Sequence, residues 1–128
     1  MINIMQILAV GFGGALGSVT RFVITKIANQ FNIILPFGTL ISNIVAALLM
    51  GLIIGIERQS QILPENIRLF LTVGCLGGLS TFSTFNIETV FYFENNNYLK
   101  GGINILLNLG LTLTFIYLGI ILGKLIKS

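Results

Sequence analysis

The sequence of 128 residues contains no histidine, one cysteine (Cys75) and four acidic residues, all of them glutamate. Because zinc sites and disulfide frameworks are built from cysteine and histidine, a thiolate or imidazole metal site within one chain is excluded, as is a disulfide scaffold. The sequence also offers no nucleophile–base pair, so an enzyme is the least favoured class of protein. Cys75 lies in an apolar run and is interpreted as a small buried hydrophobic residue.

Charge is scarce as well: 9% of the residues are charged and 55% are hydrophobic. Soluble domains average about a quarter charged residues, so this composition predicts a protein of the lipid bilayer. The formal net charge is +3, but the charged residues flank apolar segments, and no nucleic-acid partner is expected. The N-terminus lacks the basic region and the cleavage site of a signal peptide, so the first apolar run is predicted to be retained.

Four apolar stretches are long enough to cross a bilayer, which takes about twenty residues. The predicted spans are residues 4–24, 37–56, 69–91 and 103–122. The connectors are too short for a soluble domain, so residues 1–128 are predicted to form one all-α transmembrane domain. Residues 28–36 are predicted to form a short loop whose Pro36 starts the second span.

Small residues recur at the spacing that lets membrane helices approach closely. A GxxxG pattern occurs in the first, second and fourth spans and predicts tight helix packing; the pairs are Gly13 and Gly17, Gly51 and Gly55, and Gly119 and Gly123.

The third stretch contains the most unusual segment, Gly74-Cys75-Leu76-Gly77-Gly78-Leu79-Ser80-Thr81-Phe82-Ser83-Thr84-Phe85. A glycine pair followed by hydroxyl residues predicts a break in the helix near its middle. Non-helical backbone survives at membrane depth only against protein or a water-filled cavity. The carbonyl oxygens of a break at Gly77–Ser80 are hard ligands that suit a monovalent cation, and a simple kink is the alternative.

Polar side chains recur at membrane depth on three different spans. Nearly all of them can donate a hydrogen bond and none is acidic, which suits an anion better than a cation. Each one alone is also explained as a hydrogen bond between helices, but three polar stripes favour a shared route. The residues are Thr39, Ser42, Asn43, Ser80, Thr81, Ser83, Thr84, Asn104, Asn108 and Thr112.

Phe82 and Phe85 are three residues apart and so project from neighbouring positions on one helix face. The edges of their rings carry positive potential and can hold a partly dehydrated anion; simple packing is the alternative. Arg21 is interpreted as an attractor at a vestibule or as an interfacial anchor. Glu88, on the same face as Phe85, either influences ion entry, bonds neighbouring hydroxyls, or is simply solvated.

The distribution of positive charge gives almost no orientation signal. An even number of spans puts Arg58, Arg68, Lys124 and Lys127 on one side and Arg21, Lys26 and Lys100 on the other. Because four against three is nearly balanced, the chain is predicted to insert both ways and to pair as an antiparallel dimer. The alternative, that a single charge orients it, stays open.

These residues together resemble the Fluc (CrcB) family of small fluoride channels. The matching pieces are Gly13-Gly14-Ala15-Leu16-Gly17 leading to Arg21, the second-span segment Phe37-Gly38-Thr39-Leu40-Ile41-Ser42-Asn43, and the third-span motif with Glu88. The resemblance implies a passive, fluoride-selective channel, an antiparallel dual-topology homodimer with two pores, in the inner (plasma) membrane of a prokaryote, exporting fluoride from the cytoplasm.

The resemblance also implies roles for single residues. It implies that the edges of Phe82 and Phe85 face fluoride, that Asn43 donates to the ion, and that polar side chains complete the pore. It further implies a structural Na⁺ at the dimer centre. The implied pore residues are Phe82, Phe85, Asn43, Ser83, Thr39, Asn104, Asn108 and Thr112; those at the entry are Arg21, Thr81 and Glu88; the Na⁺ ligands are the carbonyls of Gly77 and Ser80.

The fourth span departs from the family, which often carries a tyrosine and serines where Asn104, Asn108 and Thr112 stand here. One rival class is the small dual-topology proton-coupled multidrug exporter, which needs a membrane-embedded acid, usually in the first helix. Residues 1–20 contain no acid. A second rival, a structural subunit that transports nothing, explains the glycine patterns but not the three polar stripes.

Overall fold

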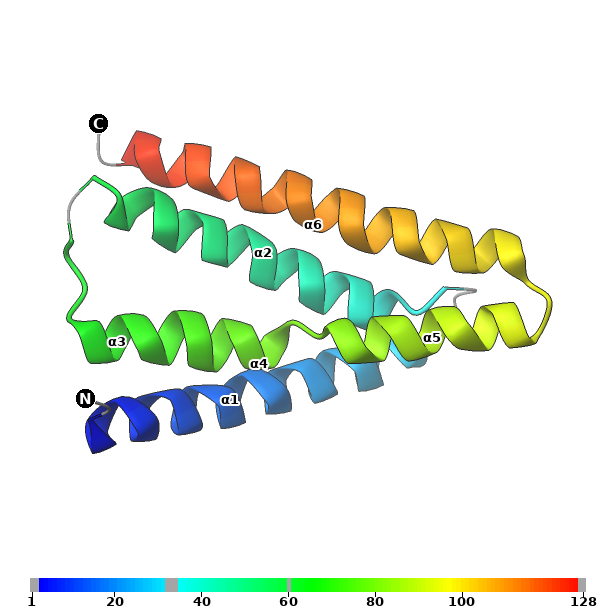
Figure 1. The fold of residues 1–128 in the computed structure, drawn as a ribbon, viewed down its shortest axis with the longest axis horizontal. Helices are drawn as coiled ribbons and strands as arrows, with labels where there is room; N and C mark the ends of the chain where they lie inside the picture. The colour runs from blue at the N-terminus through cyan, green and yellow to red at the C-terminus, as the bar shows by residue number, and fades with distance from the viewer. Residues whose placement is uncertain (1–2, 32–34, 60, 127–128) are drawn as a thin grey trace.

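The computed structural model describes residues 3–31, 35–59 and 61–126, and within these it forms four long helical spans and no strand (Figure 1). The spans are α1 (Ile4–Asn29), α2 (Phe37–Glu57), a composite third span (Glu65–Glu94) and α6 (Tyr98–Ile126). Each is long and apolar enough to cross a membrane. Both ends of the chain lie at the same end of the bundle, and the prediction of an all-α, four-span membrane protein is confirmed.

The helices run past the predicted boundaries at six of the eight ends, while α1 and α2 begin at the predicted residues, Ile4 and Phe37. α1 continues to Asn29, the third span begins at Glu65 directly after Pro64, and α6 begins at Tyr98. The predicted spans ended close to charged residues, but a helix continues as long as its backbone bonds are made, and long charged side chains can reach the interface. Residues 32–34 of the predicted loop, and Lys127 of the charge count, lie outside the described residues.

The third span consists of four helical pieces with a break at its middle, as predicted. α3 (Glu65–Leu69) leads into a π-helix, η1 (Phe70–Leu76), and then into α4 (Gly77–Leu79); α5 (Phe82–Glu94) follows the break. The break lies at the C-terminal end of the predicted segment Gly77–Ser80, because Gly77 itself is helical (φ −65°, ψ −36°). The extended residues are Ser80 (φ −76°, ψ 152°) and Thr81 (φ −149°, ψ 121°). The π-helix had no signal in the sequence.

Glycines pack α2 directly against α6. A Cβ atom added at Gly51 would overlap the carbonyl oxygen of Ile116, and one at Gly119 would overlap that of Leu48. Because only a residue without a side chain permits two backbones to lie this close, the predicted tight packing is confirmed for this pair.

A second glycine contact joins α1 to the third span. A Cβ atom at Gly13 would overlap the carbonyl oxygen of Phe70, and one at Gly17 would overlap that of Cys75. From the other side, Gly74 lies against Gly13. α1 therefore lies against η1 and α4 with backbone touching backbone, next to the break.

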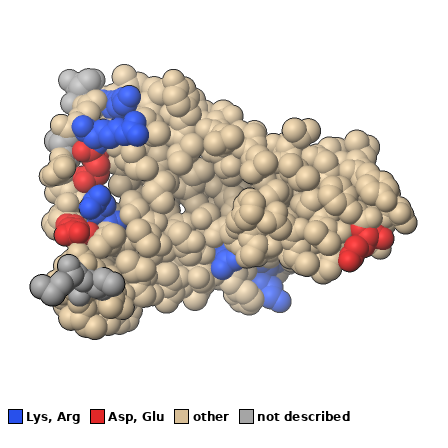
Figure 2. All heavy atoms as spheres, in the orientation of Figure 1, with Lys and Arg blue, Asp and Glu red and all other residues tan. Residues whose placement is uncertain are grey.

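The outside of the bundle is apolar. Large side chains such as Phe12, Leu106 and Leu113 are about two-thirds exposed (67%, 72% and 68%). Figure 2 shows charged side chains at the ends of the molecule and one small blue cluster on its lower side, with a broad uncharged surface between them. This distribution matches a helix bundle whose waist lies in hydrocarbon and whose ends lie in water.

Candidate ion site at the helix break

A cavity of about 310 Å³ lies between the break, α2 and α6. It is lined by polar side chains from both of these helices and from the break, by the two rings of Phe82 and Phe85, and by apolar residues such as Ala46 and Ile116. The cavity brings together seven of the predicted site residues, namely Asn43, Ser80, Thr81, Phe82, Phe85, Asn108 and Thr112. No charged residue of the described chain lines it.

Asn43 of α2 clamps the backbone of the break. Its Oδ1 accepts a hydrogen bond from the Thr81 amide (2.7 Å), and its Nδ2 donates to the Thr81 carbonyl (3.2 Å). The same Nδ2 also donates to Oδ1 of Asn108 (3.0 Å). Backbone groups at membrane depth must find partners, and here one amide side chain supplies what the interrupted helix does not.

Asn108 and Asn104 of α6 continue the network away from Asn43. Asn108 Nδ2 donates to Asn104 Oδ1 (3.0 Å), and Asn104 Nδ2 donates to the hydroxyl of Thr89 on α5 (3.0 Å). All three side chains are almost fully buried. Thr112, also predicted, donates to the Asn108 carbonyl (2.5 Å). The sequence reasoning missed Thr89, although its position four residues after Phe85 puts both on one helix face.

The rings of Phe82 and Phe85 are neighbours, as predicted, with centroids 5.5 Å apart and planes tilted by 59°. Their surroundings differ sharply: Phe85 is 4% exposed and Phe82 is 68% exposed. The tilt is typical of aromatic pairs in which the edge of one ring lies near its partner's face. Phe85 is held inside its own chain, whereas Phe82 presents most of its ring outward.

Hydroxyl side chains of the third-span motif lie at the N-terminal end of α5, where Thr81 caps the helix. Thr81 Oγ1 accepts from the Thr84 amide (3.2 Å), which makes Thr81 the N-cap, and it lies 3.0 Å from the Thr84 hydroxyl and 3.3 Å from that of Ser83. Ser80 and Ser83 are exposed. Thr81 is thus fixed by its backbone and its side chain together.

Thr39 and Glu88 form a separate polar contact between α2 and α5. The Thr39 hydroxyl donates to Oε1 of Glu88 at 2.5 Å. The other oxygen, Oε2, is buried and has no hydrogen-bond partner among the described residues. Of the alternatives left open for Glu88, bonding to a neighbouring hydroxyl is confirmed.

Arg21 reaches the break from α1. Its Nε donates to the carbonyl of Gly78 at 3.1 Å. Arg21 follows Gly13 and Gly17 at intervals of four residues, so the close glycine contact places it beside the end of α4. A cation is favourable at the C-terminal end of a helix, where carbonyls lack partners.

The carbonyls of Gly77 and Ser80 lose the donors that a continuous helix would give them. In an α-helix these donors would be the amides of Thr81 and Thr84, but those amides bond to Asn43 Oδ1 and to the Thr81 hydroxyl instead. Gly77 and Ser80 are both exposed. Two hard oxygen donors on one exposed stretch fit the coordination preferences of a small cation.

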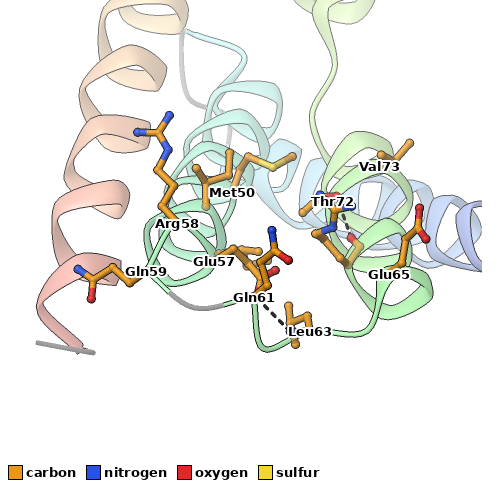
Figure 3. Close-up of a pocket in the computed structure, with 12 residues that line it drawn as sticks. Met50, Glu57, Arg58, Gln59, Gln61, Leu63, Glu65, Thr72 and Val73 are labelled. Atoms are coloured by element: carbon orange, nitrogen blue, oxygen red, sulfur yellow. Dashed lines mark hydrogen bonds between the residues drawn. The ribbon is translucent and has the colours of Figure 1, made fainter.

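A larger groove of about 1000 Å³ adjoins the cavity at the end of the bundle that carries the chain termini (Figure 3). The end of α2, with Arg58, lines one side, and Glu65 and Thr72 of the third span line the other. Met50 lines both hollows. The inner cavity therefore lies next to a groove that opens among charged residues.

The fold and the buried polar cavity define a small polytopic helical membrane protein. The comparison with protein families is consistent with this class: residues 8–120 match the family described as CrcB-like protein, Camphor Resistance (CrcB). The chain belongs to the CrcB family, and the resemblance seen in the sequence is confirmed.

Its relatives are bacterial proteins of nearly the same length. A protein of Clostridium perfringens named "Fluoride-specific ion channel FluC" is 44% identical over 120 residues, which cover 93% of this chain and 94% of the relative. Relatives with the same name in Clostridium novyi (40% identity, 98% and 99% covered) and in a Shewanella species (41%, 89% and 92%) are similar. These names describe channels, not enzymes.

Proposed function

We propose that this chain is a passive, fluoride-selective ion channel. The observation that carries the proposal is the cavity at the break, where two aromatic rings and neutral hydrogen-bond donors converge and no charged residue of the described chain takes part. The names of the relatives support the same function. A multidrug exporter is not favoured, because α1 has no acid to couple transport to protons.

The chemistry of the site matches a small, strongly hydrated anion. Fluoride loses more hydration energy than chloride when it enters a narrow pore, so closely placed donors and ring edges must replace its water. A fixed cation in the cavity would bind the ion too tightly for rapid passage. The neutral lining is therefore what selective conduction needs.

The proposed pore uses the residues expected from the sequence. Phe82 and Phe85 present ring edges to the ion. The ion then passes along a row of buried polar side chains on α2 and α6. Arg21, Thr81 and Glu88 would serve ion entry, and Glu88 is in contact with the proposed pore residue Thr39. The remaining pore residues are Asn43, Ser83, Asn104, Asn108 and Thr112.

A second, antiparallel copy completes the site. Gly77, Ser80, Phe82 and Ser83 are exposed at the middle of the third span, where lipid cannot pair with carbonyls and hydroxyls. Covering this face with an inverted copy buries those groups and adds the partner's aromatic rings to the region of the cavity. The dimer would have two pores, and the balanced positive charge of the sequence supports dual insertion.

The same pairing supplies a place for a structural Na⁺. The exposed carbonyls of Gly77 and Ser80 from two copies would hold it at the dimer centre. Bound there, the ion would neutralise four converging carbonyl dipoles and so hold the two breaks together.

The biological role follows from acid chemistry. Fluoride enters cells as the neutral acid and dissociates in a less acidic cytoplasm, so a passive channel in the inner (plasma) membrane would export it. No energy source is required, because the anion leaves down its own gradient.

The test is a flux assay on purified protein in liposomes loaded with potassium fluoride or potassium chloride. We expect fluoride to leave rapidly once valinomycin balances the charge, while chloride stays inside. Equal release of both halides, or release of neither, would refute the proposed function.

A further inference from the structure

The amide network at the break ends on Thr89, a residue that the proposed pore does not use. The Thr89 side chain is 5% exposed. Its hydroxyl donates to the Phe85 carbonyl (2.8 Å) and accepts from Asn104 Nδ2 (3.0 Å). Thr89 therefore stands between the ring-bearing turn of α5 and the polar side chains of α6.

The network as a whole forms a ladder that starts and ends on the segment carrying the two rings. It begins at the amide of Thr81, one residue before Phe82, and it ends at the carbonyl of Phe85. Between them, each member donates to the next in the order Thr81, Asn43, Asn108, Asn104, Thr89 and Phe85.

Backbone groups, which can only donate or only accept, decide the direction of the bonds along the ladder. The Thr81 amide can only donate, so Asn43 must turn its oxygen toward it and its nitrogen toward Asn108. The Phe85 carbonyl can only accept, so the Thr89 hydroxyl must donate to it and keep its oxygen for the Asn104 amide. The Thr81 carbonyl also accepts from Asn43 Nδ2, and the Asn104 carbonyl accepts from Asn108 Nδ2, so backbone groups orient these two amides directly. The Asn104 amide is oriented only by Asn108 and Thr89.

We propose that Thr89 is a positioning residue, which fixes the orientation of the Asn104 amide and through it supports Asn108 at the wall of the cavity. This inference rests on the proposed function, because the position of Asn108 matters for conduction only if an anion passes the cavity. In a water-poor interior such bonds are strong and polarise one another, and an unpaired donor is costly. Without the Thr89 hydroxyl, Asn104 loses its acceptor and the ladder is no longer anchored on α5.

The chain offers a matched control for removing one hydroxyl. Thr114 on α6 donates to the Gly110 carbonyl at 2.8 Å, the same bond that Thr89 makes to Phe85, but Thr114 is exposed on the outside of the bundle. Thr89→Val and Thr114→Val therefore delete the same group and the same backbone bond, and only the first breaks the ladder.

The flux experiment compares four proteins in fluoride- and chloride-loaded liposomes: wild type, Thr89→Val, Thr89→Ser and Thr114→Val. We expect Thr89→Val to lower fluoride flux about tenfold, the factor that corresponds to one lost buried hydrogen bond. Thr89→Ser keeps the hydroxyl and should restore most of the flux, and Thr114→Val should match wild type. Wild-type flux in Thr89→Val, or a loss in Thr89→Ser equal to that in Thr89→Val, would overturn the inference.

A second measurement does not depend on conduction. NMR of the asparagine side-chain amides should show slow hydrogen exchange for Asn43, Asn104 and Asn108 in the wild type. In Thr89→Val, the signal of Asn104 should shift, and that of Asn108 should shift although it lies two bonds along the ladder from the mutation. An Asn104 amide in the wild type that exchanges as fast as exposed Asn95 would refute the inference even if Thr89→Val fails to fold. A wild type that shows the ladder but passes no fluoride would refute the proposed function alone.

Discussion

Two helix pairs, α2 with α6 and α1 with the third span, pack through the same kind of glycine contact. They differ in whether the helix backbone is continuous or broken. In both, glycines let one helix lie directly on the carbonyls of the next. α6 nevertheless continues unbroken through 29 residues, while the third span stops at Ser80 and Thr81. Glycine spacing therefore sets how closely helices approach and does not decide where a helix breaks.

The two pairs differ in which side chains form hydrogen bonds with the backbone of the helix. On α6, the side chains of Asn108 and Thr112 bond to carbonyls four residues earlier, and such bonds are compatible with a helix. On the third span, the Thr81 amide is taken by Asn43 from another helix, and Arg21 takes the Gly78 carbonyl. Side chains from α1 and α2 replace the helix's own bonds and hold the break open.

The largest effect is expected when a glycine contact is blocked. A Cβ atom in Gly17→Ala would overlap the Cys75 carbonyl, and backbone cannot give way as a flexible side chain can. We expect a loss of about 3 kcal/mol or more of stability, measured as the yield of monodisperse protein and as the Tm in detergent. Gly119→Ala should behave alike.

Neighbouring glycines give the controls for this comparison. A Cβ atom at Gly14 or at Gly110 meets no described atom within 4 Å, so Gly14→Ala and Gly110→Ala should fold normally. If Gly17→Ala folded as well as Gly14→Ala, the two helix pairs would not share the same contact.

The second effect concerns the clamp on the break. Asn43→Asp keeps an oxygen for the Thr81 amide but places a carboxylate against the Thr81 carbonyl and Asn108 Oδ1, where the amide donated. Losing these buried bonds should lower fluoride flux by well over about tenfold. Asn95→Asp, which changes an exposed asparagine at the end of α5, should keep normal flux. Normal flux in Asn43→Asp would mean that the break is held by something other than this clamp.

The third effect separates the two rings. Phe85→Ile and Phe82→Ile should each reduce fluoride flux by up to about tenfold, the range of aromatic pair energies. Phe85→Ile should lower the Tm more than Phe82→Ile, because Phe85 is buried within its own chain, whereas Phe82 is largely exposed there and would be covered only by the second copy. Wild-type flux in both variants would leave the rings as packing groups.

The smallest effect is expected at Arg21. Arg21→Gln weakens one hydrogen bond to the Gly78 carbonyl, and such a bond contributes about 1 kcal/mol. We expect flux to fall by a few-fold and stability to fall slightly. Lys26→Gln removes a positive charge from the same helix. The Lys26 ammonium lies over the Phe22 ring (5.7 Å) and not at the break, so this variant should reduce flux less than Arg21→Gln. An equal loss of flux in Arg21→Gln and Lys26→Gln would mean that Arg21 acts through its charge and not through its hydrogen bond to the break.

Much of the fold could be predicted because it depends on local composition. The length of each apolar run predicts a span wherever it occurs, and the run of glycines before Arg21 predicts close packing whatever the partner is. Phe82 and Phe85 are neighbours because helical geometry puts residues three apart side by side. The third-span motif carried the family resemblance for the same reason, since a motif is contained in the sequence itself.

Only the tertiary structure decided which groups bond to one another at the break. The sequence predicted a break within Gly77–Ser80, and the structure places it at Ser80 and Thr81, because Asn43 comes close enough to take the Thr81 amide. The sequence puts Thr89 on the same helix face as Phe85, but only the packing of α6 against α5 brings Asn104 beside it. Hydrophobic runs act through their own length, whereas a buried hydrogen bond depends on two groups far apart in the chain meeting at the right distance and angle.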